Sequence, residues 1–392
     1  MLTQQEALPK QTLKQSGLLT TGLALFSMFF GAGNLIFPLL IGKDVGSNVW
    51  YAVTGLGITA VVVPFLGLIA MLLFQADYSR FFSRIGKQPG ILLLLLLQLI
   101  LGPLGVIPRL ITLMHAIAKP YLFEIPLGAF TVLAGVIIFA CSFQRQRLVA
   151  YLGGIFTPIL LLSLFALIAV GLFSGTAMNS DVPSAQSSFF QGLLGGYNTM
   201  DLIAAFLFAT VVLPHFQKNK GKPGHEHDLR KMFLSSAIAA ALLFLTYVGL
   251  CFISAYHGWN LGNCPPQQMI SAIAHQVLGP IGGCIAAVAV LTACLTTAMT
   301  LTSIFADYLQ KDLCKGKMHP VLALFLTVGL TGIFANLGFE GIAAFLGPIL
   351  QVVYPGLILL TLLNLLHALY GQKIVRVPVY LTFTGAAVIY LF

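Results

Sequence analysis

The chain has 392 residues, of which 58% are hydrophobic and 8% are charged, whereas about a quarter of the residues of a soluble globular domain are charged. This composition excludes a soluble domain and indicates a polytopic helical membrane protein, because outer-membrane barrels have short alternating segments and the apolar runs here are continuous. The net charge of +9 is expected to come from basic cytoplasmic loops, and no nucleic-acid partner is expected.

Eleven apolar runs are expected to cross the lipid bilayer as helices. A crossing needs about 17 to 25 residues, so each run is long enough for one span. The runs cover residues 17–41, 49–74, 90–117, 127–143, 149–173, 192–215, 232–256, 269–304, 319–336, 341–368 and 376–392.

The basic residues predict the orientation of these spans. Seventeen of the 20 Lys and Arg residues fall in alternate connections, and the other connections contain only Lys43 and Lys119. Connections rich in Lys and Arg lie on the cytoplasmic side of a membrane. Residues 1–16 are therefore predicted to be a cytoplasmic N-terminal tail, and the end of the eleventh span is predicted to lie outside.

The first run contains residues that do not suit a continuous helix. Gly31, Gly33, Asn34 and Pro38 are poor helix formers, and they lie in the middle of the run. Inside a membrane, a broken helix is tolerated only where its free backbone groups meet protein, water or a ligand. We therefore expect this stretch to line the substrate and ion site of a secondary transporter.

The third run is also predicted to be interrupted, at Gly102-Pro103 and Pro108, and it contains Arg109, the one basic residue inside a span. Asp201, in the sixth run, is the only carboxylate clearly inside a span, at a similar predicted depth. Two interpretations stay open. Either Asp201 is a ligand, a proton site or a gate, or the two residues form a static ion pair that fixes two helices.

The sixth run contains a second stretch of small and polar residues. Gly195-Gly196-Tyr197-Asn198 repeats the pattern of Gly31-Ala32-Gly33-Asn34 five spans later. An odd number of spans in each half inverts one half relative to the other, and interrupted helices at matching places of inverted repeats indicate a transporter binding site. This predicts one repeat over residues 17–174, a second over 192–368, and an eleventh span over 376–392.

Two such breaks offer the groups that bind a zwitterion. Half-helices that begin after a break present N–H groups, which suit a carboxylate, and those that end before it present C=O groups, which suit a cation. The nearby polar residues are Ser27, Asn34, Tyr197, Asn198 and Thr199, and the large apolar ones are Phe29, Phe30, Ile36, Phe206 and Phe208. This pocket favours an aliphatic amino acid. One methylene is worth about 1–3 kcal/mol of discrimination, so Leu, Ile and Val are expected to be poorly separated.

The eighth run carries a row of hydroxyl groups. Thr292, Thr296, Thr300 and Ser303 lie along one face at helical spacing, and Thr297 adjoins Thr296. Hydroxyls in membrane helices usually bond to their own helix or to a neighbouring span. The alternative is that a hydroxyl pair faces the carbonyls of a broken helix and completes an oxygen cage for a small monovalent cation.

The segment His225-Glu226-His227-Asp228 supports the alternative from another class, a polytopic membrane enzyme with a cytoplasmic catalytic face. Its spacing does not match a closed zinc site, and a solvated loop is the simpler interpretation. The chain also contains none of the common hydrolase or P-loop patterns. We therefore expect a carrier without a cofactor, and not an enzyme.

Four stretches together resemble the signature sequences of the bacterial branched-chain amino acid carrier family. They are Phe29 to Pro38, Gly102-Pro103 with Pro108-Arg109, Gly196 to Asp201, and Ala293 to Ala298. They follow one another in the family's order from the first to the eighth span. That family is similar to the wider amino acid–polyamine–organocation superfamily, so the resemblance implies an all-α, leucine-transporter-like fold with a core of five plus five inverted spans.

The resemblance implies uptake of Leu, Ile and Val coupled to sodium, across the bacterial inner membrane. It implies that Thr296 and Thr297 bind sodium together with carbonyls around Ala293 and Phe30, and that the amides of residues 31–33 bind the substrate carboxylate. The complete set of residues expected to bind the substrate is Phe30, Gly31, Ala32, Gly33, Asn34, Tyr197, Asn198, Thr199 and Phe206.

Two alternatives within the carrier class stay open: coupling to protons through Asp201, and transport of another neutral amino acid. Family members usually have twelve spans, whereas this chain stops at Phe392 within the eleventh. The ten-span core is expected to transport without the last span, while the oligomeric state is left open.

Overall fold

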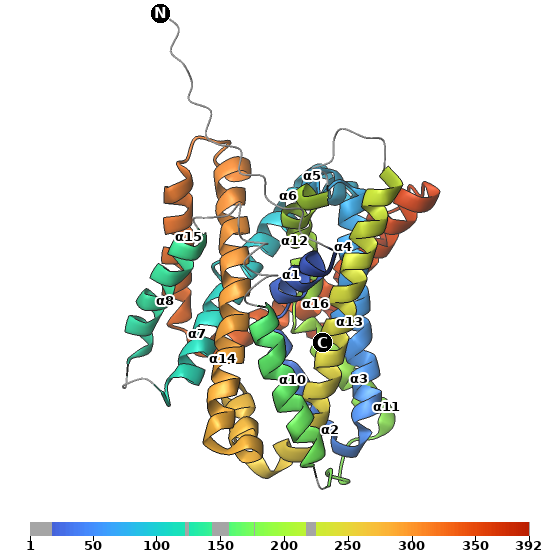
Figure 1. Ribbon diagram of the computed structural model, residues 1–392. Helices are drawn as coiled ribbons and strands as arrows, with labels where there is room; N and C mark the ends of the chain where they lie inside the picture. The colour runs from blue at the N-terminus through green and yellow to red at the C-terminus, as the bar shows by residue number, and fades with distance from the viewer. Residues whose placement is uncertain (1–17, 122–124, 143–156, 176, 217–224, 392) are drawn as a thin grey trace, which may run out of the picture.

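The computed structural model describes residues 18–121, 125–142, 157–175, 177–216 and 225–391. Every regular element in these residues is helical (Figure 1). The α-helices are α1 (Leu18–Phe29), α2 (Ala32–Val45), α3 (Val49–Gly57), α4 (Val63–Leu73), α5 (Tyr78–Phe82), α6 (Lys87–Leu101), α7 (Val106–Ala118), α8 (Leu127–Ser142), α10 (Thr157–Phe173), α11 (Ala185–Tyr197), α12 (Asp201–Phe216), α13 (His225–His257), α14 (Met269–Tyr308), α15 (Pro320–Ala335), α16 (Gly338–Tyr370) and α17 (Arg376–Leu391).

Short segments of other helical types join several of these helices. Two are π-helical, η2 (Ile58–Val62) between α3 and α4 and η8 (Leu309–Leu313) after α14. The remaining ones are 3-10 helices: η1 (Gly46–Asn48), η3 (Ser83–Ile85), η6 (Gly258–Leu261) and η7 (Pro266–Gln268).

Six helical stretches among the described residues are long and apolar enough to cross a membrane. They are Ala32–Leu73, Lys87–Ala118, Ala185–Leu213, Arg230–Leu261, Pro266–Leu313 and Gly338–Tyr370. Four shorter apolar helices, of 10–17 residues, are Leu18–Phe29, Leu127–Ser142, Thr157–Phe173 and Pro320–Ala335. Each predicted run corresponds to one α-helix or to a consecutive pair of them, and the eleventh corresponds to α17, which is not among the stretches just named. Residues 1–16 and the start of the fifth run lie outside the described residues. The number of crossings and the two inverted halves stay predictions.

The short helix α1 lies inside the bundle (Figure 1) and packs against α10, α12, α13 and α14. On one side of the bundle, α8 and α15 pack on each other and on α14. On the opposite side, α3 packs along α11 and against α13. Because α1 is enclosed by other helices, the groups that its broken end leaves unpaired meet protein rather than lipid.

Small residues allow some of these helices to approach each other closely. A Cβ on Gly42 of α2 would collide with the carbonyl of Cys251 in α13, and a Cβ on Gly192 of α11 would collide with the carbonyl of Ala52 in α3. Close backbone contact at small residues is typical of helix packing in membranes.

Three predictions about local structure can be compared with the observed helices. The third run is interrupted as predicted, since residues 102–105 separate α6 from α7. The eighth run has an additional kink at Gly279, where φ is 65°, just before Pro280. The prediction of a solvated loop at His225–Asp228 is wrong in its secondary structure, because these residues form the first turn of α13.

Candidate substrate and ion site

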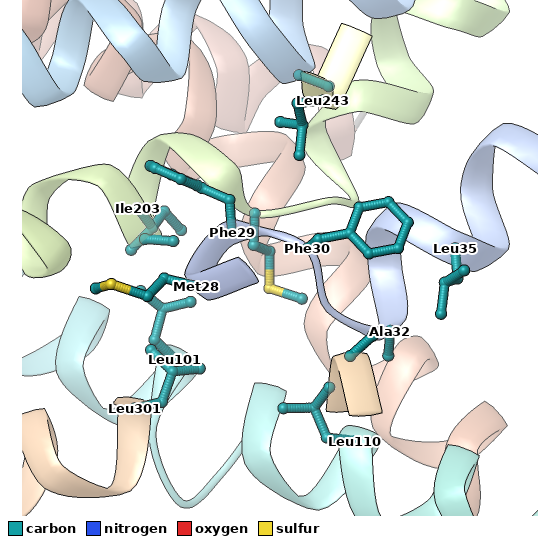
Figure 2. Close-up of a cluster of buried hydrophobic side chains, with 14 of the residues drawn as sticks. Met28, Phe29, Phe30, Ala32, Leu35, Leu101, Leu110, Ile203, Leu243 and Leu301 are labelled. Atoms are coloured by element: carbon teal, nitrogen blue, oxygen red, sulfur yellow. The ribbon is translucent and has the colours of Figure 1, made fainter. Parts of the chain in front are cut away.

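Two helix breaks lie close together inside the bundle. In the first, α1 ends at Phe29, the chain is extended at Gly31 (φ −116°, ψ −159°), and α2 begins at Ala32. Figure 2 shows α1 ending near Phe29 and the chain running through a non-helical segment to Ala32. In the second, residues 198–200 separate α11 from α12, and Met200 has a φ of 61°.

Each break differs by a few residues from its predicted position. Gly33 and Asn34 belong to the first turn of α2, and Gly195 and Gly196 belong to the last turn of α11. The two glycines of α11 serve packing: a Cβ on Gly196 would collide with the hydroxyl of Thr59. The four-residue patterns therefore sit on opposite sides of their breaks, and their similarity does not mark equivalent structural positions.

The two breaks touch each other through Gly33. A Cβ added to Gly33 would lie 3.1 Å from Cα of Thr199 and 3.2 Å from the carbonyl oxygen of Asn198. The first turn of α2 therefore rests directly on the backbone of the α11–α12 break. Only a glycine permits this distance without displacing one of the two segments.

Asn34 connects the two breaks by side-chain hydrogen bonds. Its Oδ1 accepts a bond of 3.0 Å from the N–H of Gly31, and its Nδ2 donates to Oδ1 and Oδ2 of Asp201 at 2.9 and 2.7 Å. Nδ2 is also in contact with the hydroxyl of Tyr247 in α13, which donates to Oδ2 of Asp201 at 2.8 Å. All three side chains are at most 2% exposed. We call Asn34, Asp201 and Tyr247 the polar triad.

A second tyrosine supports the start of α12. The hydroxyl of Tyr354 in α16 accepts a bond of 3.0 Å from the N–H of Leu202, one of the backbone donors that a helix start leaves unpaired. Its ring stacks on that of Tyr197, with the centroids 4.8 Å apart. Tyr197 therefore packs on α16 at the end of α11.

A small cavity lies between the breaks, with free space of about 20 Å³, room for about one water molecule. Its polar lining comes from both breaks and from two other helices. Its apolar lining includes Phe29, Leu101, Phe208 and Leu301. The whole lining is Met28, Phe29, Gly31, Ala32, Gly33, Asn34, Leu101, Val106, Arg109, Thr199, Met200, Asp201, Ala204, Phe208, Thr297 and Leu301. Figure 2 shows the side chains of Met28, Leu101 and Leu301 gathered on one side of the end of α1.

Arg109 reaches this cavity from α7, but it does not pair with Asp201. The structure has no ion pair between these two described residues, so of the two open interpretations the static ion pair is wrong. Asp201 accepts hydrogen bonds from Asn34 and Tyr247 instead. The Arg109 guanidinium instead lies 4.8 Å from the ring centroids of both Phe37 and Phe339.

The end of α1 presents a group of oxygens to α14. Thr297 Oγ1 lies 3.3–3.4 Å from the carbonyl oxygens of Ser27, Met28 and Phe30. Thr296 Oγ1 lies 3.2 Å from the carbonyl oxygen of Ser27 and 2.9 Å from that of Ala293. We call these carbonyls and the two hydroxyls the oxygen cluster. The other predicted hydroxyls bond back to α14 itself, as Thr300 does to the carbonyl of Thr296 at 2.9 Å.

The oxygen cluster has more oxygens than hydrogens to satisfy them. One hydroxyl hydrogen of Thr297 faces three carbonyls, and all three distances exceed the usual 2.5–3.0 Å of an O–H···O bond. The buried Ser27 hydroxyl has no hydrogen-bond partner within the described parts of the chain. Such a cluster is chemically suited to a hard cation, which prefers oxygen ligands.

The sequence matches the family described as "branched-chain amino acid transport protein" over residues 14–391. It is 30% identical to the branched-chain amino acid permease BraB of Bacillus subtilis (strain 168) over 376 residues, which are 93% of this chain and 83% of BraB. The chain belongs to the branched-chain amino acid transport protein family. This family consists of multi-pass membrane transporters, so the alternative of a membrane enzyme is excluded.

Two solved transporter structures resemble this family member in fold. The inward-facing conformation of Mhp1 matches with a TM-score of 0.61 and 14% identity, over 91% of this chain and 78% of Mhp1. A mutant of the manganese transporter of Eremococcus coleocola matches with a TM-score of 0.64 and 13% identity, over 98% of this chain and 88% of that one. At these identities the likeness concerns the fold alone, which is leucine-transporter-like.

Most of the residues that the sequence predicted to bind the substrate or the ion lie at the site, although several have contacts other than those predicted. Phe30 contributes its carbonyl to the oxygen cluster, while its ring stacks on Phe26 at 5.1 Å. Phe206 packs against Phe81, with the ring centroids 5.2 Å apart, and does not line the cavity. Phe208 lines it instead, because residues two positions apart point to different sides of a helix.

The sequence did not predict the two tyrosines whose hydroxyls bond at the breaks, nor the apolar lining residues Met28, Leu101, Val106, Met200, Ala204 and Leu301. Tyr247 lies in an apolar run without a glycine–proline signal or a neighbouring charge, so nothing local distinguishes it from a core aromatic residue. Tyr354 directly precedes Pro355-Gly356, which is a local signal that could have drawn attention to it. A buried tyrosine needs a partner for its hydroxyl, but the sequence does not name that partner.

Proposed function

We propose that this chain is a secondary active transporter that imports Leu, Ile and Val together with sodium by alternating access. The observation that carries the proposal is that two helix breaks meet at one small cavity beside the oxygen cluster. The proposal includes eleven spans, a core of five plus five inverted spans, a cytoplasmic N-terminus and a place in the bacterial inner membrane.

Backbone amides at the start of α2 are suited to the substrate carboxylate. The first N–H groups of a helix have no partner within it, and its positive dipole end favours an anion. The N–H of Gly31 already donates to Asn34, so the amides of Ala32 and Gly33 are the better candidates.

The apolar lining is suited to a branched aliphatic side chain. The side chains of Phe29, Phe208 and Leu301 are each at most 2% exposed, and they offer no polar atom to a ligand. The free space of about 20 Å³ cannot hold an amino acid, so binding requires the surrounding helices to move apart. This requirement agrees with a carrier that alternates between open and closed states and does not agree with a permanently open channel.

Sodium is the coupling ion that we infer from the oxygen cluster. One positive charge moving inward gains about 2.3 kcal/mol per 100 mV, which supports substrate accumulation on the order of fifty-fold. The alternative is a proton-coupled carrier of another neutral amino acid, with Asp201 as the proton site. The hydrogen bonds that both oxygens of Asp201 accept favour an ionised carboxylate, which can only accept, and so favour sodium.

Uptake in proteoliposomes tests this proposal. Labelled leucine should accumulate when an inward sodium gradient is imposed, and unlabelled Leu, Ile and Val should compete. A proton gradient alone should give no accumulation. Leucine inside the vesicles should accelerate the entry of labelled leucine, as in a carrier. Accumulation driven by protons without sodium would contradict the assignment of the ion, and absence of leucine transport with either gradient would contradict the substrate.

A further inference from the structure

The most unusual charge in the described structure is the guanidinium of Arg109. Its side chain is 2% exposed, and its Nε and Nη2 atoms are buried without a hydrogen-bond partner among the described residues. A buried charge is costly unless an opposite charge or hydrogen-bond acceptors compensate it. The rings of Phe37 and Phe339 stabilise the cation by cation–π contacts, but they leave the N–H groups of its edge unused.

Arg109 forms no ion pair with a carboxylate of the described residues. Asp201 lines the same cavity, but its oxygens accept hydrogen bonds from Asn34 and Tyr247. The two opposite charges thus face one cavity without pairing with each other.

The backbone around this cavity adds to the positive potential at Arg109. The first turn of α2 contributes Ala32 and Gly33 to the lining, and the first residue of α7, Val106, lies in the lining as well. Two helices therefore begin at the cavity that the guanidinium reaches, and the N-terminus of a helix attracts anions. An anion here would meet N–H donors from the backbone and from a planar guanidinium, which suits a carboxylate.

We propose that Arg109 binds the carboxylate of the transported amino acid by a direct ion pair. The inference rests on the proposed function, because it takes an amino acid as the ligand. Arg109 then selects zwitterions over cationic analogues of the same shape, while Phe37 and Phe339 hold the guanidinium in position.

The test compares leucine with leucinamide, which has the same side chain and amino group but no carboxylate. Equilibrium binding to the purified full chain is measured for the wild type and for Arg109→Gln. The wild type should prefer leucine by roughly a hundredfold or more, as expected for a buried charge pair. Arg109→Gln should weaken leucine binding by a similar factor and leave leucinamide binding within about threefold, so that the preference disappears.

Arg84→Gln is the matched control, because it removes a guanidinium that donates to Asn364 in α16 and to the carbonyl of Gln372 beyond that helix, and that does not line the cavity. It should keep the wild-type preference. If Arg109→Gln does not fold, Arg109→Lys decides, since lysine keeps the charge and loses the planar fork. Its preference for leucine should fall at least several-fold, and an unchanged preference would overturn the inference.

Three results would overturn the inference while leaving the proposed function intact. One is an equal loss of leucine and leucinamide binding in Arg109→Gln, which would indicate a structural role. Another is a wild-type preference for leucine that persists in Arg109→Gln. The third is a chloride requirement for leucine binding that Arg109→Gln removes, which would assign the guanidinium to an inorganic anion. A wild type that binds no branched-chain amino acid would instead contradict the proposed function.

Discussion

Asn34, in the first turn of α2, donates hydrogen bonds from its amide nitrogen to both oxygens of Asp201, the first residue of α12. The two residues are 167 positions apart in the chain. Each lies in the first turn of the half-helix that follows a break, so this contact ties the two discontinuous helices together at the cavity. Tyr247 adds a contact from α13, and the three buried side chains satisfy one another.

The substitution Asn34→Asp tests this connection. It keeps the size of the side chain but replaces the N–H donor by an oxygen that faces the Asp201 carboxylate. Repulsion between two buried carboxylates should cost about 3–5 kcal/mol, lower the unfolding temperature and abolish leucine binding. Asn336→Asp, at an exposed amide at the end of α15, is the control and should have little effect. Wild-type stability of Asn34→Asp would show that the contact is dispensable.

Tyr247→Phe removes only the hydroxyl that donates to Asp201. The ring still fills its buried position, but one carboxylate oxygen loses a charge-assisted bond of 2.8 Å. We expect a destabilisation of about 1.5–3 kcal/mol, measured by thermal unfolding in detergent. Tyr51→Phe, at a residue that is 52% exposed, should change stability very little. Equal effects of the two substitutions would argue against the polar triad.

Gly33→Ala tests the contact between the two breaks. The new methyl group would meet Thr199 Cα at 3.1 Å and the carbonyl oxygen of Asn198 at 3.2 Å, so the segments must move apart. Such overpacking costs about 1–3 kcal/mol, and leucine uptake should fall by roughly tenfold or more. Gly329→Ala in α15 is the control, since no heavy atom lies within 4 Å of its Cβ position. Full uptake by Gly33→Ala would mean that the contact is not needed.

Thr297→Val tests the oxygen cluster. Valine keeps the shape of threonine but removes the hydroxyl that faces the carbonyls of residues 27, 28 and 30. The sodium concentration for half-maximal leucine uptake should rise about tenfold or more, and Thr297→Ser should restore it. Thr292→Val is the control on the same helix, because its hydroxyl bonds only to the carbonyl of Val288. Asn34→Ala should also weaken the dependence of leucine uptake on sodium by more than it lowers the expression level of the protein. Unchanged sodium activation in both Asn34→Ala and Thr297→Val would count against a cation site.

The positions of the helices were predictable because the signals for them are local. The predicted run 127–143 corresponds to Leu127–Ser142, and 319–336 corresponds to Pro320–Ala335. The breaks at the first, third and sixth runs were predictable for the same reason, since glycine and proline disfavour helix wherever they occur. Their limits were not, because Pro38 is accommodated inside α2 and Gly196 is needed for packing against Thr59.

The sequence by itself determined that this is a helical membrane protein with interrupted spans, and its motifs identified the family. Only the tertiary structure decided which groups meet: Asn34 with Asp201 and Tyr247, Thr297 with the end of α1, and Arg109 with two rings rather than with a carboxylate. The physical reason is that hydropathy and helix propensity act over a few neighbouring residues. A buried hydrogen bond or charge depends on partners that only the packing of distant helices brings within 3–5 Å.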